Sequence, residues 1–108
     1  MAKGNNEFVV HMLNTFIDNA EVNLKKLEGF LSENNWEQIG ETVHRMLPSF
    51  RHLGIQPVIT DLVEIKDKVS DNNPGAEEIS SLMKHVAGTT QKVIFDLEKE
   101  IKRGLQQE

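Results

Sequence analysis

One helix and both of its boundaries can be read in NWEQIGETVHRMLPSFRHLGIQP, residues 35–57. Asn35 suits an N-cap, and Gln38, three positions later, fits a capping box. Gly54 is a typical C-terminal stop, and Pro57 suits the first turn of a following helix. Between these signals the apolar residues recur at helical spacing and predict one buried stripe. The stripe contains Trp36, Ile39, Val43, Met46, Leu47, Phe50 and Leu53.

The same periodicity predicts three further helices, over residues 6–33, 57–69 and 76–105. The stripe of the first contains Phe8, Met12, Phe16, Ala20, Leu24, Leu27 and Leu31. No segment of the sequence alternates as a strand does. Short connections between helices favour antiparallel neighbours. We therefore predict a single all-α domain over residues 1–108, an antiparallel (up-down-up-down) four-helix bundle with long first and last helices.

Composition narrows the classes of function. The chain has 108 residues, which suits one domain, and a formal net charge of −5. That charge argues against a nucleic acid or an anionic membrane as partner, because phosphate binding relies on clustered Lys and Arg. The sequence has no cysteine, no apolar run of membrane-spanning length and no signal-peptide pattern. We expect a cytoplasmic domain that makes no membrane contact, either free-standing or part of a longer chain.

Most motifs of catalysis and metal binding are absent from the sequence. It contains no P-loop, no GxGxxG and no cysteine nucleophile. The histidines show no HExxH or HxxxH spacing, so zinc has little support, and we expect no cofactor. They are His11, His44, His52 and His85.

His44 is the histidine with the most suggestive setting. It lies one position off the apolar stripe and is expected to face solvent. Gly40, one turn earlier, and Pro48, one turn later, lie on the same side, and neither has a long side chain. The free nitrogen of a neutral imidazole is a competent nucleophile. These residues alone still leave an incidental surface histidine as the alternative.

The segment HRMLPSFRHLG, residues 44–54, resembles the signature of histidine-containing phosphotransfer (HPt) domains. In that family a hydrophobic residue follows the phospho-accepting histidine at +2, serine at +5 and Leu-Gly at +9 and +10. The matching residues here are Met46, Ser49, Leu53 and Gly54. The arrangement of the flanking helices agrees over nearly the whole chain. The resemblance implies a four-helix bundle with His44 as phosphoacceptor.

Two positions depart from the family's pattern. Leu47 replaces the usual lysine, and Pro48 replaces the usual glycine. A phosphoryl group carries roughly two negative charges, so another cation would have to compensate them. Arg51 and Lys66 are the candidates, with ordinary solvated cations as the alternative interpretation. Gly40 and the compact ring of Pro48 would keep access to His44 open.

The resemblance also implies partners. His44 would take a phosphoryl group from a receiver-domain aspartate and pass it to another, with Mg²⁺ held by the receiver. Such a protein is a histidine phosphocarrier without kinase activity of its own. Its partners would be response-regulator receiver domains, bound transiently, and a sensor histidine kinase. The domain itself could be the cytoplasmic end of a membrane-bound hybrid sensor kinase, and it would be a monomer.

A docking surface for the receiver is expected on the first helix, where the apolar face is wider than a bundle stripe requires. This face comprises Val9, Met12, Leu13, Phe16 and Ile17. The alternative interpretation is that it packs inside the bundle.

Two other classes of protein compete with this interpretation. The dimerisation and phosphoacceptor region of a histidine kinase normally has an acidic residue directly after the histidine and a proline at +5. Here Arg45 follows His44, and Pro48 stands at +4. The second competitor is a non-catalytic helical adaptor bundle, in which His44 has no chemical role.

Overall fold

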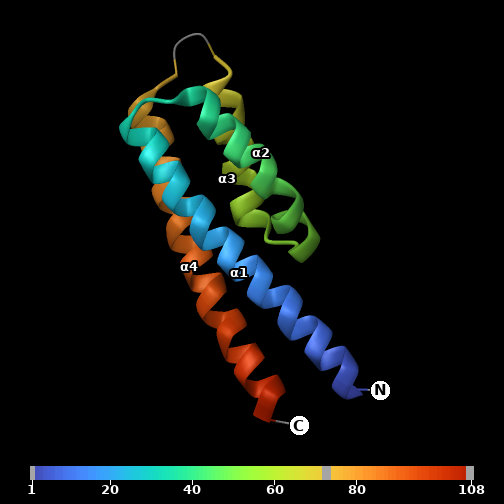
Figure 1. The fold of residues 1–108 in the computed structure, drawn as a ribbon. Coiled ribbons are helices and arrows are strands. Elements are labelled where there is room, and N and C mark those ends of the chain that lie inside the picture. The colour runs from blue at the N-terminus through green and yellow to red at the C-terminus, as the bar shows by residue number, and fades with distance from the viewer. Residues whose placement is uncertain (1, 72–73, 107–108) are drawn as a thin grey trace.

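The computed structural model describes residues 2–71 and 74–106, and four helices run through them. They are α1 (Ala2–Ser32), α2 (Trp36–Leu53), α3 (Gln56–Val69) and α4 (Ala76–Gln106). Each helix packs against its neighbours in the sequence, and α1 also packs against α4, which closes the bundle (Figure 1). The predicted all-α four-helix bundle is confirmed.

The boundaries of α2 follow from the local signals in the sequence. The side chain of Asn35 accepts a hydrogen bond from the backbone N–H of Gln38 at 3.3 Å. At the other end Gly54 has φ of 68°, in the left-handed region that glycine adopts without steric cost. The N–H of Ile55 then donates to the carbonyl of Phe50 at 3.1 Å, as in a Schellman-type stop. The chain thus reverses within a few residues and lays α3 beside α2.

The core lies where all four helices run side by side. Phe50 of α2 is 2% exposed, and its ring meets Phe16 of α1 edge to face, with centroids 5.1 Å apart. Aromatic pairs of this geometry add to the free energy gained from burial alone. Further fully buried side chains come from α2, α3 and α4: Ile39, Val43, Val58, Leu62, Ile65, Ile79 and Val86.

The outer helices are much longer than the inner pair. α1 and α4 have 31 residues each, whereas α2 has 18 and α3 has 14. The chain ends therefore lie together on a two-helix extension that α2 and α3 do not cover (Figure 1). Phe8 lies on this part of α1 and is 70% exposed. The prediction that Phe8 belongs to the buried stripe is wrong, because α2 ends before it can cover that side chain.

Two polar contacts fix α3 against α4. Asp61 pairs with His85, and about two turns further along α3 Lys68 pairs with Glu78. The hydrogen bond and the charge of Glu78 raise the pKa of Lys68, and those of Lys68 lower the pKa of Glu78. The Lys68–Glu78 contact therefore weakens as the pH falls and Glu78 becomes protonated. Together the contacts set the register of α3, the helix that carries Lys66.

The core assignment predicts a sharp contrast between two phenylalanines. Replacing buried Phe50 by alanine should lower the free energy of unfolding by about 3–5 kcal/mol, because it removes core contacts and leaves a cavity. Phe95 is 57% exposed and contacts the ammonium of Lys99 at 4.5 Å from its ring centroid. Phe95→Ala should cost less than about 1 kcal/mol. Urea denaturation followed by circular dichroism measures both, and equal losses would contradict the assigned core.

Candidate functional site

His44 lies in the middle of α2 with its side chain exposed. Its neighbours Val43 and Met46 are 0% and 2% exposed and face the core. A helix advances about 100° per residue, so burying those two positions turns His44 outward. The expectation that His44 faces solvent is confirmed.

Lys66 of α3 reaches across to this histidine. Its Nζ lies 3.5 Å from Nδ1 of His44. An ammonium group has three donors and no acceptor, so in this contact Nδ1 is the acceptor. Within the described residues no protein group is hydrogen-bonded to Nε2 of the same ring. The geometry leaves Nε2 as the nitrogen that an incoming group can reach.

The two side chains share a shallow hollow of about 300 Å³ between α2 and α3. Its lining residues are Trp36, Glu37, Gly40, Glu41, His44, Lys66, Val69 and Ser70. Gly40 lies next to His44, where its expected role in access requires it to be. The structure gives a second reason for glycine, because a Cβ there would lie 3.3 Å from Cγ2 of Val69. The absent side chain lets α3 approach α2 closely enough for Lys66 to reach the imidazole.

Pro48, about one turn after His44, does not line that hollow. The helix continues through it to Leu53, although proline has no N–H to donate to the carbonyl of His44. Pro48 borders a groove of about 500 Å³ between α1 and α2, here called the α1–α2 groove. The residues that line it are Phe8, His11, Met12, Thr15, Phe16, Asn19, Pro48, Ser49, His52 and Leu53. The hollow around His44 and the α1–α2 groove share no lining residue.

The structure divides the predicted docking face of α1. Phe16 and Ile17 are only 7% and 5% exposed and pack into the core, as the alternative interpretation of this face expects. Val9 is 43% exposed, and Met12 and Leu13 are half-buried. Of the five, Met12 and an edge of Phe16 border the α1–α2 groove.

Phe8 also lines that groove and was missed as a docking candidate. The feature that points to Phe8 is the difference in length between α1 and α2. α1 extends beyond the level at which α2 stops at Gly54, so an apolar residue there has fewer neighbours to cover it.

The two candidate cations, Arg51 and Lys66, differ in whether they contact His44. Arg51 is exposed and does not border the hollow around His44, and among the described residues it forms no hydrogen bond or ion pair through its side chain. Arg45, next to His44 in the sequence, pairs with Glu41 at 3.8 Å. Leu47, at the position where the resemblance leads one to expect lysine, is 3% exposed and faces the core. Lys66 is thus the cation that contacts the imidazole.

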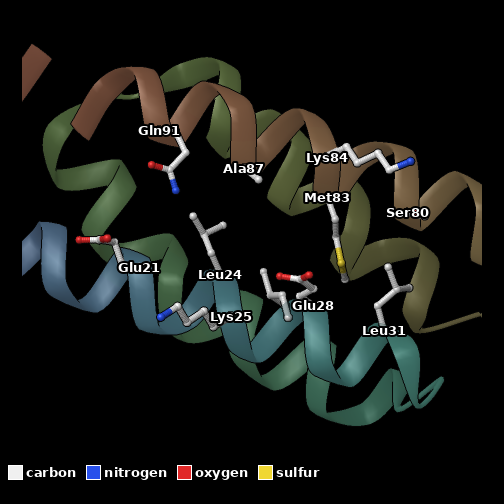
Figure 2. A pocket seen from close by; sticks show the side chains of 11 residues that line it. Glu21, Leu24, Lys25, Glu28, Leu31, Ser80, Met83, Lys84, Ala87 and Gln91 are labelled. Carbon is white, nitrogen blue, oxygen red and sulfur yellow. The ribbon is translucent and has the colours of Figure 1, made fainter. Parts of the chain in front are cut away.

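A second hollow, of about 410 Å³, lies between α1 and α4 (Figure 2). Leu24, Met83 and Ala87 contribute apolar surface, and Lys25 and Glu28 are among the charged groups around it. No histidine lines it.

Among residues 2–71 and 74–106, no group of three or more His, Cys, Asp or Glu is arranged to hold a metal ion. None of the helices in that part of the chain combines the length and apolarity needed to cross a bilayer. Comparison with family models, curated proteins and solved structures finds no match to this chain. Function is therefore inferred from the residues around His44.

The packing at Gly40 leads to a test of the site's architecture. Gly40→Leu should destabilise the bundle by about 1–3 kcal/mol, because the new side chain would overlap Val69 and push α3 away. Gly29→Leu is the matched control, since a Cβ at Gly29 meets no other group within 4 Å. That change should be neutral or slightly stabilising, because leucine is the better helix former. Urea denaturation compares the two, and equal stability of both variants would rule out the close approach.

Proposed function

We propose that this chain is a phosphorelay intermediate of the histidine-containing phosphotransfer type. His44 accepts a phosphoryl group from the aspartate of one receiver domain and passes it to the aspartate of another. The observation that carries the proposal is an exposed imidazole in the middle of α2 whose Nδ1 contacts the ammonium of Lys66. The resemblance of residues 44–54 to the phosphotransfer signature supports the same chemistry.

The transfer needs little from this chain beyond a well-placed nucleophile. In the tautomer that carries its proton on Nδ1, the electron pair of Nε2 forms the N–P bond while the P–O bond of the aspartyl phosphate breaks. That bond's electrons return to the aspartate carboxylate, and the Nδ1 proton leaves to solvent. The same step in reverse loads the next receiver. Phosphoryl transfer depends mainly on positioning and on stabilisation of charge. A helix held by the core supplies the positioning, the ammonium of Lys66 offsets phosphoryl charge, and Mg²⁺ acts from the receiver.

The α1–α2 groove is the proposed seat of the receiver. Its apolar lining includes Phe8, Met12 and Leu53, and Pro48, which also lines it, follows His44 by about one helical turn. A groove of this size fits the modest interface of a transient complex. The proposal also implies a monomeric, cytoplasmic domain acting downstream of a sensor histidine kinase.

The proposal predicts that phosphorylation of the protein depends on His44. Incubation with a phosphorylated receiver and Mg²⁺ should place acid-labile phosphate on the wild type and none on His44→Gln. His85→Gln is the control, because His85 is exposed on α4 and lines neither the hollow with Lys66 nor the α1–α2 groove, and glutamine keeps a donor for Asp61. Label on His44→Gln at the wild-type level would exclude His44 as phosphoacceptor. No label on either protein with several receivers would favour an adaptor bundle.

The docking surface has its own test. Phe8→Asp should lower the rate of transfer from a receiver about tenfold at sub-saturating concentration, because a charge would enter the apolar groove. Phe95→Asp, at a site on α4 that is 57% exposed and lies outside the groove, should leave the rate unchanged. Chemical labelling of His44 by phosphoramidate should be the same in both variants. Equal transfer rates for the two variants would place docking elsewhere.

A further inference from the structure

The contact between Lys66 and His44 selects a protonation state of the imidazole. Because the ammonium can only donate, Nδ1 must keep its electron pair for the 3.5 Å contact to be a hydrogen bond. In a neutral ring the single proton then lies on Nε2. Attack by Nε2 requires that proton to exchange through solvent to Nδ1 while Lys66 swings aside. The resting contact therefore holds the ring in its less nucleophilic form.

The phosphorylated ring fits the same contact better. With phosphorus on Nε2, the neutral ring keeps its electron pair on Nδ1, where the ammonium donates. Loss of the phosphoryl group to water forms a P–O bond and breaks the N–P bond, whose electron pair goes to Nε2. The ring leaves far more readily when Nδ1 is protonated, because the departing group is then neutral imidazole and not an anion. Any group that opposes protonation of Nδ1 slows this loss.

We propose that Lys66 is a positioning residue that prolongs the lifetime of the phosphohistidine by occupying Nδ1 and opposing its protonation. This inference rests on the proposed function of His44. Lys66 would contact Nδ1 in both the unphosphorylated and the phosphorylated imidazole. Spontaneous loss of the phosphoryl group becomes slow, and release awaits a receiver whose docking displaces the lysine.

Other charges near His44 act in different directions. Glu37 and Glu41 of α2 line the same hollow and favour a protonated ring, and Arg45 offsets Glu41 by pairing with it. From α3, Lys66 opposes protonation at a distance of 3.5 Å. Its neighbour Asp67 is exposed and does not line the hollow. Of these charged groups, Lys66 is the one whose side chain directly contacts the ring within the described residues.

The test follows the decay of chemically installed phosphate. The intact protein is phosphorylated with potassium phosphoramidate, the reagent is removed, and ³¹P NMR records the loss of phosphohistidine between about pH 5 and 8. Lys66→Met should lose phosphate about three- to tenfold faster near neutral pH, with the pH–rate profile displaced to higher pH. Lys66→Arg should restore the slow decay, since guanidinium also only donates. Arg51→Met, which removes an exposed cation outside the hollow, should decay as the wild type does.

The inference would be overturned if Lys66→Met lost phosphate with the same pH–rate profile as the wild type. It would also be overturned if Arg51→Met accelerated the loss as much as Lys66→Met does. ¹⁵N NMR of the unphosphorylated imidazole supplies a readout independent of phosphotransfer. The wild type should carry its proton on Nε2, and Lys66→Met should show a larger share of the Nδ1–H form. Unchanged tautomers would also overturn the inference. If His44 takes no phosphate in the wild type, the proposed function fails as well. If His44 is phosphorylated but Lys66 has no effect on the decay, only the proposed role of Lys66 fails.

Discussion

The close approach of α3 to α2 at Gly40 is the contact on which the site depends. Cγ2 of Val69 would lie 3.3 Å from a Cβ at position 40, which is closer than an ordinary van der Waals contact. The same pair of helices brings Nζ of Lys66 to 3.5 Å from Nδ1 of His44. The register of α3 is held from its other side by Asp61 with His85 and by Lys68 with Glu78. The packing of α3 against α2 thus determines which side chain contacts the imidazole of His44.

The cation that contacts His44 comes from a neighbouring helix and not from α2 itself. Leu47 faces the core, so the position one turn from the histidine adds to stability and cannot supply a cation. Lys66 supplies it from the last turn of α3. A lysine that approaches Nδ1 from the side differs from a cation beside the phosphoryl oxygens, because it acts on the protonation of the ring as well as on charge. This difference is the basis for proposing a long-lived phosphohistidine.

The unequal lengths of the helices explain the main errors of sequence interpretation. Helical periodicity marks Phe8 and Phe16 as members of one stripe, yet one is 70% exposed and the other 7%. Periodicity reports which face of a helix is apolar and carries no information on how far the neighbouring helices extend. The core ends where α2 and α3 end, and the apolar face of α1 continues beyond it as the wall of the α1–α2 groove.

The sequence by itself determined the four helices, the caps of α2 at Asn35 and Gly54, and the outward direction of His44. All of these depend on local backbone preferences or on the phase of a single helix. Only the tertiary structure decided between Arg51 and Lys66, and it divided the predicted docking face into core and groove. Those outcomes depend on distances between helices, which are set by side-chain packing at positions such as Gly40 and Val69. A single helix pattern cannot encode them, because residues remote in the sequence determine which side chains meet.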